Sequence, residues 1–387
     1  MTASAASAPA AEPAVRRIEL ASLRIRDFRN LAAIELELPA DGLALIGDNG
    51  HGKTNLLEAI YYLQLFRSFR GARDTELVRF GATAFHVAAS ASGARAARMS
   101  AGFECGIGRR PGRKRILIDG AEPEAIADAV GVIPAVLFAP RDAVIVAGAP
   151  SERRRFLDVM LSLASRPYLR TLQRYRAALV RRNLALRDAQ RGGHLDAVAA
   201  WEPALAQAGA ALVAARAHWA RIASPAFTTL CAEIGERGHA AMHYHGPVDD
   251  APDAADALQE ALERRRALHV RRGMTLDGPH RDDLALELDE RELRTYGSAG
   301  QQRTAAIALR LLEASTLRDA CTVEPLVLLD DPFAELDVRR ASRILELLEH
   351  GARGQTVLAV PREDEIPHRF TRLERHRVVH GSIRGDA

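Results

Sequence analysis

Cysteine, aromatic residues, long apolar runs and lysine are all scarce in this 387-residue chain. The cysteines are three, Cys105, Cys231 and Cys321, and no CxxC pair is present, which argues against structural zinc and indicates a reducing, cytoplasmic compartment. Aromatic residues make up 5% of the chain, and no aromatic ladder interleaves the basic residues, so stacking on single strands is not supported. No run of about 18 apolar residues occurs, and we expect no membrane span.

Lysine is the scarcest of these residues, and its position is informative. Of 53 basic residues, only Lys53 and Lys114 are lysines. Lys53 belongs to residues 47–54, Gly-Asp-Asn-Gly-His-Gly-Lys-Thr, which match the phosphate-binding loop pattern at every fixed position. An apolar run at 43–46 precedes the loop, and apolar residues at helical spacing follow at 55–63. Because an arginine fork does not fit where a compact ammonium does, the retained lysine supports a nucleotide-binding loop.

The chemistry of such a loop follows from its residue types. Glycines permit backbone conformations closed to other residues, so that the loop N–H groups and the helix N-terminus can point at phosphate oxygens. Lys53 would reach the terminal phosphates of ATP, and the Thr54 hydroxyl would hold Mg²⁺. The candidate nucleotide-binding residues are therefore Gly47, Asp48, Asn49, Gly50, His51, Gly52, Lys53 and Thr54.

A second apolar segment, residues 326–329, ends in two carboxylates, Asp330 and Asp331. This is the expected form of a magnesium-binding strand. Asp330 would hold Mg²⁺ together with Thr54. Asp331 is placed to act as a base or an orienter for the attacking water, which makes Asp330, Asp331 and Lys53 the candidate catalytic residues.

Residues 297–303, Gly-Ser-Ala-Gly-Gln-Gln-Arg, precede a long Ala- and Leu-rich helix. Ser298 and the N–H groups after it would lie at the start of that helix, where anions bind. In ATPases that close by pairing two heads, this element binds the γ-phosphate held by the other subunit. Ser298 and Gly300 are therefore further candidate nucleotide contacts.

By these motifs, and by four others, the chain resembles the RecF family of bacterial DNA replication and repair proteins. The additional matches are Phe-Arg-Asn at 28–30, Leu-Phe-Ala-Pro-Arg-Asp at 137–142, Arg-Arg-Arg-Phe-Leu-Asp at 153–158 and Gly-Pro-His-Arg-Asp-Asp at 278–283. The first of them adds Arg29 to the nucleotide-binding candidates. The resemblance implies ATP and Mg²⁺ as cofactors and an ATP-dependent homodimer on gapped or junction DNA. It also implies a weak, DNA-stimulated ATPase used as a switch, a role in repair and the SOS response, and partners of the RecO and RecR type.

The chain departs from the family pattern at three places. Ala299 replaces the usual Gln of the signature, and Ala334 replaces the Ser that precedes Glu-Leu-Asp in the loop joining paired sites. Residues 357–362 lack the usual Thr-Ala-Thr type of switch, and no His that would read a γ-phosphate follows that strand. These departures concern hydrolysis and its coupling to pairing, and they leave nucleotide binding untouched.

The fold class expected is α/β: an ABC-type P-loop ATPase head with a mixed sheet, interrupted by a lobe of antiparallel helices. We expect a disordered tail at 1–16, the first part of the ATPase domain at 17–150, a helical insertion at 151–273 and the second part at 274–387. Within the insertion, helices are predicted at 151–160, 168–187, 195–235 and 253–272. Because this insertion is short, the rival reading, a structural head of a chromosome-organising complex, is disfavoured.

A net charge of +3 permits nucleic-acid binding without demanding it. Arg166, Arg170 and Arg174 recur every fourth residue and could share one helix face with the arginines that follow, Arg176, Arg181, Arg182 and Arg187. Such a row could contact duplex phosphates, or it could be a solvated face. The same alternative applies to the basic turn at 108–114. An ATPase acting on a partner other than DNA is a second rival.

Two segments contain histidine beside possible ligands. For residues 280–283, His-Arg-Asp-Asp, a structural turn in which Arg281 pairs with a carboxylate is favoured over a metal site. For residues 243–245, His-Tyr-His, a surface turn is favoured over a ligand pair.

Overall fold

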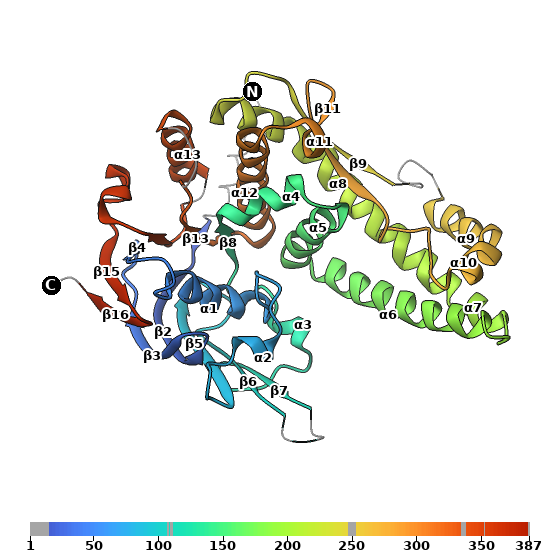
Figure 1. Ribbon diagram of the computed structural model, residues 1–387, viewed down its shortest axis with the longest axis horizontal. Coiled ribbons are helices and arrows are strands. Elements are labelled where there is room, and N and C mark those ends of the chain that lie inside the picture. The colour runs from blue at the N-terminus through green and yellow to red at the C-terminus, as the bar shows by residue number, and fades with distance from the viewer. Residues whose placement is uncertain are drawn as a thin grey trace, which may run out of the picture.

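The computed structural model describes residues 15–106, 108, 111–246, 253–333, 338–351 and 353–385. At its centre is a six-stranded mixed sheet, in which only the edge strand β16 runs antiparallel to its neighbour. The order across the sheet is β16 (Ser382–Gly385), β15 (Glu374–Val379), β4 (Gly42–Ile46), β14 (Thr356–Val360), β13 (Leu326–Asp330) and β8 (Ala135–Phe138). Segments from both ends of the chain thus form one sheet, as expected for an ATPase domain interrupted in sequence (Figure 1).

Strands β4, β13 and β14 of this sheet are buried on both faces over most of their length, which explains their largely apolar sequences. In β4, Leu43 and Leu45 pack into one hydrophobic core, whereas Ala44 and Ile46 pack into another. Strand β13 divides its side chains between the same two cores. The sheet therefore separates the two hydrophobic cores. Side chains packed on both of its faces fix the positions of the strand ends.

The first core lies between the sheet, helix α1 (Lys53–Leu65) and a second sheet that is entirely antiparallel. That second sheet consists, in order, of β3 (Leu31–Glu37), β2 (Glu19–Phe28), β5 (Ala84–Ser92), β6 (Arg98–Glu104) and β7 (Arg113–Ile118). Helix α1 contacts strands of both sheets, so almost all of its faces are buried. Its start, which carries the phosphate-loop lysine, is thereby fixed in position.

The other core joins the central sheet to the helical lobe, which extends away from the sheets in Figure 1. The lobe's helices are α5 (Pro150–Ala164), α6 (Arg166–Ala189), α7 (Asp196–Ala199), α8 (Glu202–Ile234), α9 (Ala254–Arg264) and α10 (Arg266–Arg272). Helix α12 (Ala299–Cys321) packs on both α5 and α8 and connects the lobe to the sheet. The mixed sheet and the long helical lobe confirm the expected fold class.

One segment of the described chain, Asp196–Ile234, is long and apolar enough to cross a membrane by length and composition. Half of its most apolar window is buried inside the protein. Helix α8 in this segment packs against α6, α9, α12 and β9 (Ala240–His245), and it carries Glu202 and Arg216 at buried positions. The apolar character of this segment is accounted for by the packing of a core helix.

Residues 243–245 do not form the surface turn that the sequence suggested. They lie in β9, which pairs with β10 (Asp283–Leu288), and β10 pairs in turn with β11 (Arg291–Glu292). The Tyr244 side chain is buried because alternate residues of a strand point to opposite faces. The helical insertion thus contributes a strand to a small sheet with the chain that follows it.

Several sequence features lie partly or wholly outside the described residues: the tail at 1–14, part of the basic turn, and residues 334–337 with Ala334. Arg16, expected in the tail, already belongs to β1 (Arg16–Arg17), which pairs with β12 (Val323–Glu324). The four-part division of the chain stays a prediction.

Candidate nucleotide-binding site

The loop of residues 47–52 connects the end of β4 to the start of α1, as the sequence predicted. Two of its glycines are required by close approach to other segments. Gly52 has φ 117°, and a Cβ there would lie 3.0 Å from Asn30 Oδ1. A Cβ on Gly47 would lie 2.3 Å from the carbonyl oxygen of Val378 in β15. The loop is therefore pressed between the β2–β3 turn and β15, and larger residues at these positions would displace it.

Lys53 is buried, and its ammonium lies within the loop. It donates hydrogen bonds to the carbonyl oxygens of Gly47 and, at 3.1 Å, of Asp48. Burial lowers the pKa of Lys53, and the nearby carboxylates oppose that shift, chiefly Asp330 and Asp331. The Lys53 ammonium therefore interacts both with the loop carbonyl oxygens and with the carboxylates at the end of β13.

The two predicted magnesium ligands meet across the sheet. Thr54 Oγ1 donates a hydrogen bond of 2.8 Å to Asp330 Oδ1, although the residues are 276 positions apart. Burial raises the pKa of the Asp330 carboxyl, and the Thr54 hydrogen bond opposes that shift. A buried carboxylate adjoining a hydroxyl is the oxygen donor set that Mg²⁺ prefers, so these residues fit the metal.

Asp331 follows Asp330 directly and also faces the loop. Its backbone is left-handed, at φ 47°, and its N–H donates to the carbonyl oxygen of Ala359 in β14. Both carboxylates line a cavity of about 350 Å³ together with Lys53 and Thr54. The turn at Asp331 is what places two consecutive carboxylates on the same cavity.

Arg70 and Glu58 belong to the site, and neither was predicted from the sequence. Arg70 lines the cavity, donates 3.1 Å to Asn55 Oδ1, and lies 3.8 Å from the buried carboxylate of Glu58. Ser68 also donates to Glu58. The available signal was a carboxylate one turn after Thr54 in an otherwise apolar helix, because a buried charge requires partners.

Arg29, a predicted nucleotide contact, is held by the same carboxylate. It donates hydrogen bonds of 2.9 and 3.1 Å to the two oxygens of Glu58, and one of 3.2 Å to the carbonyl oxygen of Glu76. Its neighbour Asn30 reaches the loop instead, donating 3.3 Å to the carbonyl oxygen of Gly50. The structure thus places Asn30 directly on the loop and Arg29 one layer behind, on Glu58.

The remaining loop residues have distinct surroundings. Asn49 and Gly50 are exposed and line the cavity. Asp48 is exposed and uses its carbonyl oxygen to accept from Lys53. His51 points away from them, with Nδ1 3.2 Å from the carbonyl oxygen of Val378 and its ring 4.6 Å from that of His380. The His51 side chain therefore anchors the loop to β15.

The predicted signature forms the start of α12, as expected. Ser298 accepts a hydrogen bond from the Gln301 N–H, and the Gln301 side chain accepts from the Ser298 N–H, which is a capping box. Ser298 and Gly300 are exposed, and neither lines the cavity around Lys53. Within one chain the signature and the loop are thus separate surfaces.

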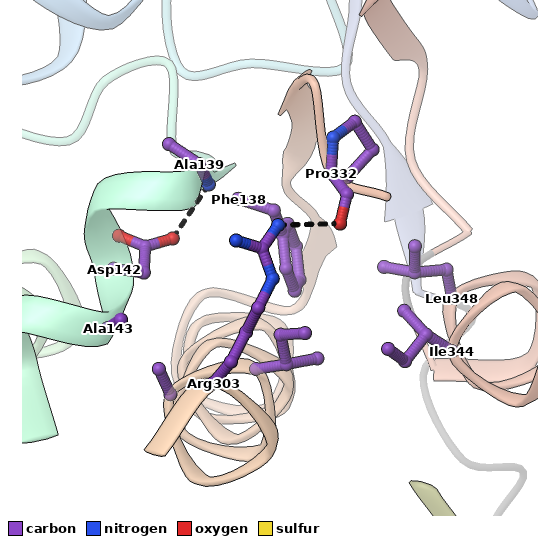
Figure 2. Close-up of a pocket in the computed structure, with 10 residues that line it drawn as sticks. Phe138, Ala139, Asp142, Ala143, Arg303, Pro332, Ile344 and Leu348 are labelled. Atoms are coloured by element: carbon purple, nitrogen blue, oxygen red, sulfur yellow. Dashed lines mark hydrogen bonds between the residues drawn. The ribbon is translucent and has the colours of Figure 1, made fainter. Parts of the chain in front are cut away.

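Arg303 connects this signature helix to the carboxylate strand. Figure 2 shows its side chain extending from α12 toward Pro332, whose carbonyl oxygen accepts a hydrogen bond of 3.1 Å. Arg303 is buried at 7% exposure, between Phe138 of β8 and the side chains of α13 (Val338–Gly351). Because Pro332 follows Asp331 directly, this hydrogen bond links the start of α12 to the end of the carboxylate strand.

Comparison with known proteins agrees with this geometry. The model of the RecF/RecN/SMC N-terminal domain family matches residues 19–370. The DNA replication and repair protein RecF of Salinibacter ruber is 38% identical over 357 residues, covering 89% of this chain and 85% of the relative. The chain belongs to the RecF family.

For other RecF relatives, the alignment with this chain covers nearly the whole length of the relative. The DNA replication and repair protein RecF of Herpetosiphon aurantiacus is 34% identical, covering 93% of this chain and 98% of the relative. A solved structure of the recombination mediator protein RecF with ATP has a TM-score of 0.87 at 26% identity, covering 97% of this chain and 99% of that one. An Smc head bound to a ScpA domain has a TM-score of 0.51 at 13% identity, which shows a shared fold alone.

The middle RecF-family motifs lie at the joint between the lobe and the ATPase sheets. Arg153 is buried and pairs bidentately with Asp283, at 2.8 and 2.7 Å. Arg154 donates to the carbonyl oxygen of Asp282, and the Asp282 carboxylate accepts from the Tyr244 hydroxyl. These contacts favour the packing role for Arg153 over contact with DNA.

The segment 280–283 is a structural turn, but Arg281 is not paired as the sequence suggested. Arg281 donates to the sulfur of Met274, whereas the two carboxylates of the motif contact Arg153 and Tyr244. Among the described residues, no group of three His, Cys, Asp or Glu side chains could hold a metal ion.

The arginine row on α6 is divided by the structure. Arg182 is fully buried and pairs with Glu202, so it cannot contact DNA from the surface. Arg166 is held by Asp128 and by backbone carbonyl oxygens of α3 (Ile126–Ala129). Five members remain exposed on the helix: Arg170, Arg174, Arg176, Arg181 and Arg187, of which Arg176 pairs with Asp158.

Proposed function

We propose that this RecF-family chain is an ATP-dependent DNA-binding protein of recombinational repair and replication restart. The observation that carries the proposal is the hydrogen bond from Thr54 to Asp330, with Lys53 in the loop beside it. This arrangement supports ATP binding at residues 47–54, with Thr54 and Asp330 as the ligands of Mg²⁺. RecF relatives are named for DNA replication and repair, and a solved relative is described with ATP.

The chain's own residues would perform the remaining work. Lys53 neutralises the terminal phosphates, and the glycine loop cradles them with backbone N–H groups. Asp331 orients the attacking water and accepts its proton. Bound Mg²⁺ would supply charge neutralisation at the phosphate oxygens. Arg70 lines the same cavity as Lys53, where a second cation can stabilise negative charge that develops on the phosphates.

Pairing of two heads completes the proposed switch. The exposed signature, Ser298 to Gly300, supports a role on the nucleotide of a second copy, since it lies off the cavity of its own chain. The pair would hold gapped or junction DNA, hydrolysis would release it, and partners of the RecO and RecR type would act with it in the cytoplasm.

Lys53→Arg is expected to weaken ATP binding by roughly ten- to a hundredfold, because a hydrogen bond to a charged group contributes about 1.5–3 kcal/mol. An arginine fork cannot occupy the buried ammonium position among the loop carbonyls. Titration with a fluorescent ATP analogue measures the effect. Lys114→Arg, at the only other lysine, is the matched control, since Lys114 pairs with Asp74 outside the cavity. Equal ATP affinities in the two variants would show that the loop of residues 47–54 does not bind the nucleotide.

Sedimentation with and without ATP–Mg²⁺, each with and without a gapped duplex, tests the whole proposal. The expected result is that ATP converts monomer to dimer and that the dimer holds the DNA. DNA binding that is equally strong without ATP would contradict the switch.

The rival reading, an SMC-like structural head, predicts an obligate partner and a long coiled coil. The longest helix of the described chain, α8, has 33 residues, or about 50 Å at 1.5 Å per residue. It folds back against α6 and α9 rather than extending as a coiled coil. These observations favour the repair switch.

A further inference from the structure

A second and larger hollow lies next to the nucleotide cavity. This groove, of about 910 Å³, runs between the end of α1 and β8 on one side and helices α5 and α6 of the lobe on the other. Figure 1 shows the elements that contribute its lining, among them helices α1, α5 and α6 and strand β8. We call it the lobe groove and define it by three rim residues, Arg67, Arg141 and Arg155, and three floor residues, Leu65, Val159 and Leu172.

The rim of the lobe groove carries unneutralised positive charge. Arg67, Arg141 and Arg155 are all exposed, and none is paired with a carboxylate among the described residues. In contrast, three carboxylates of the lining are already paired: Asp74 with Lys114, Asp142 with Arg310, and Asp158 with Arg176 and Arg216. The lining also contains Glu152, for which the described residues show no ion pair, so the unpaired charge of the lining is three arginines against one carboxylate and is net positive.

The floor is apolar, and apolar side chains continue to the edge of the groove. Ile126 is 51% exposed and Val144 is 39% exposed, and both belong to the lining. The lining also contains Ser162, which is 6% exposed and whose hydroxyl has no hydrogen-bond partner among the described residues. The groove thus offers apolar contacts and a cationic rim.

Only two short segments separate the lobe groove from the nucleotide cavity. In the first, Ser68 and Phe69 line the groove while Arg70 lines the cavity. In the second, Arg141 lines the groove while Pro140 lines the cavity. Two of the rim arginines, Arg141 and Arg155, donate hydrogen bonds to backbone carbonyl oxygens of the first of these segments.

Two hydrogen bonds make that connection. Arg155 donates 3.5 Å to the carbonyl oxygen of Ser68, and Arg141 donates 3.3 Å to the carbonyl oxygen of Arg70. A ligand that draws either guanidinium toward itself would release the segment that carries Arg70. The groove and the nucleotide cavity are therefore connected through the segments that carry Arg70 and Arg141.

We propose that the lobe groove is the docking site for an acidic, amphipathic peptide segment of a partner protein, and that docking is coupled to the nucleotide through Arg70. Carboxylates of the segment contact the rim arginines, and its apolar side chains enter the floor. Docking rests on the groove alone, whereas the coupling rests on the proposed ATP site.

The groove favours a peptide over DNA. A phosphate backbone can use the rim arginines but has no apolar groups to place on the floor. A volume of about 910 Å³ suits a few anchoring side chains, since ligand pockets measure roughly 300–1,000 Å³. DNA binding at the groove is therefore the outcome that the test must distinguish.

The probes are fluorescein-labelled peptides of Glu, Leu and Phe, made in helical and in alternating patterns and measured by anisotropy on the full chain. Matched peptides replace every Glu by Lys, or every Leu and Phe by Ala. We expect the acidic amphipathic peptides to bind and both replacements to abolish binding. No binding by any acidic pattern, or equal binding by the Lys series, overturns the proposal.

The groove variant is Arg67→Glu combined with Arg155→Glu, and the control is Arg170→Glu combined with Arg174→Glu. The control pair is exposed on α6 and does not line the groove. Peptide affinity should fall by roughly tenfold or more in the groove variant alone, because two charge-assisted contacts are lost. Equal losses of peptide affinity in both variants would overturn docking. Competition in which duplex DNA displaces the bound peptide from the groove would also overturn it.

Coupling is measured as the change in ATP affinity caused by saturating peptide. Linkage requires the peptide affinity to change by the same factor when ATP saturates the protein, and Arg70→Ala should reduce that factor to one. ATP affinity unchanged by bound peptide overturns the coupling. ATP binding without peptide is read separately, so loss of the ATP site itself appears as no nucleotide binding in any sample.

Discussion

The residues around the proposed phosphates are held by one buried carboxylate as much as by the loop itself. Glu58 contacts Arg29, Ser68 and Arg70, which come from two separate segments, the turn after β2 and the loop after α1. Such a buried carboxylate is stable only with its cations in place, since removal of one partner of a buried pair costs about 3–5 kcal/mol. The same interaction therefore positions Arg70 at the cavity and keeps Arg29 behind it.

Asp331→Asn is expected to slow ATP hydrolysis by roughly 10²–10⁴-fold, because general base catalysis contributes about that factor. Asn tolerates the left-handed backbone at this position, so the turn is kept and ATP affinity should be unchanged. Single-turnover phosphate release measures the rate, and titration measures the affinity. Asp319→Asn, at an exposed site, should leave both values as in the parent. A parental rate in Asp331→Asn would remove this carboxylate from the mechanism.

His280 makes folding stability depend on pH. It lies between the Tyr175 hydroxyl, 2.6 Å from Nδ1, and the carbonyl oxygen of Thr275, 3.0 Å from Nε2. Burial lowers its pKa to about 4, from 6.5, against the favourable hydrogen bond to Thr275. The unfolded chain therefore binds a proton near pH 6.5 that the folded chain binds only near pH 4. Stability should fall as pH decreases across this window.

Urea unfolding of the parent and of His280→Gln at several pH values between 8 and 4 tests this. The loss of stability attributable to His280 should grow toward at most about 3 kcal/mol at the acidic end. Because Gln does not titrate, the variant should lose less stability over the same window. Parallel pH profiles for the two proteins would refute the assignment.

At the scale of elements, α6 shows how a helix face is decided by what packs on it. The spacing of its arginines predicted one basic face. In the structure Arg182 turns inward, pairs with Glu202 at 2.8 Å, and donates to Thr275 at 2.8 Å. It joins α6 to α8 and to the segment before β10, so its charge is structural.

Arg182→Ala should lower the free energy of unfolding by about 3–5 kcal/mol, because Glu202 is left buried with one partner fewer. Arg170→Ala, on the exposed side of the same helix, should change it by less than about 0.5 kcal/mol. Chemical denaturation followed by circular dichroism gives both values. A loss of similar size in both variants would show that the burial of Arg182 is not what matters.

The first two turns of helix α12 have different surroundings. Its first turn presents Ser298 and Gly300 to solvent, whereas Arg303, one turn further, is buried against Pro332. A contact made by a second copy at the first turn would therefore act directly on the segment after Asp331. Ala299, the departure from the family signature, lies in the exposed turn and leaves the capping box intact.

At the scale of the whole molecule, the proposed switch needs two copies to bring the signature onto a nucleotide. Ser298→Arg should leave ATP binding by the monomer intact and abolish ATP-dependent dimers, because a bulky cation replaces a small cap on the exposed face. Ser298→Thr, which keeps a capping hydroxyl, should still dimerise. Sedimentation equilibrium with ATP–Mg²⁺ compares the two. Dimers of Ser298→Arg would contradict the cross-subunit role.

The local motifs were readable from the sequence because their chemistry depends on neighbouring residues. A phosphate loop needs its glycines, lysine and threonine in one stretch, and a carboxylate strand needs an apolar run that ends in Asp. The approximate positions of helices and buried strands followed from periodicity, since buried strands are apolar throughout and helices repeat every 3.6 residues, whereas the mixed sheet was implied by the family resemblance. The resemblance to RecF rested on the same contiguous motifs.

Contacts between distant segments were decided only by the tertiary structure. The burial of Arg182, the attachment of Arg29 to Glu58, the strand at 243–245 and the place of Arg70 each depend on residues brought together from separate elements. Side-chain direction in a helix or strand is set by the core that forms around it, and no local pattern encodes that core. The sequence by itself therefore determined which chemistry is present, and packing decided which charged residues serve it.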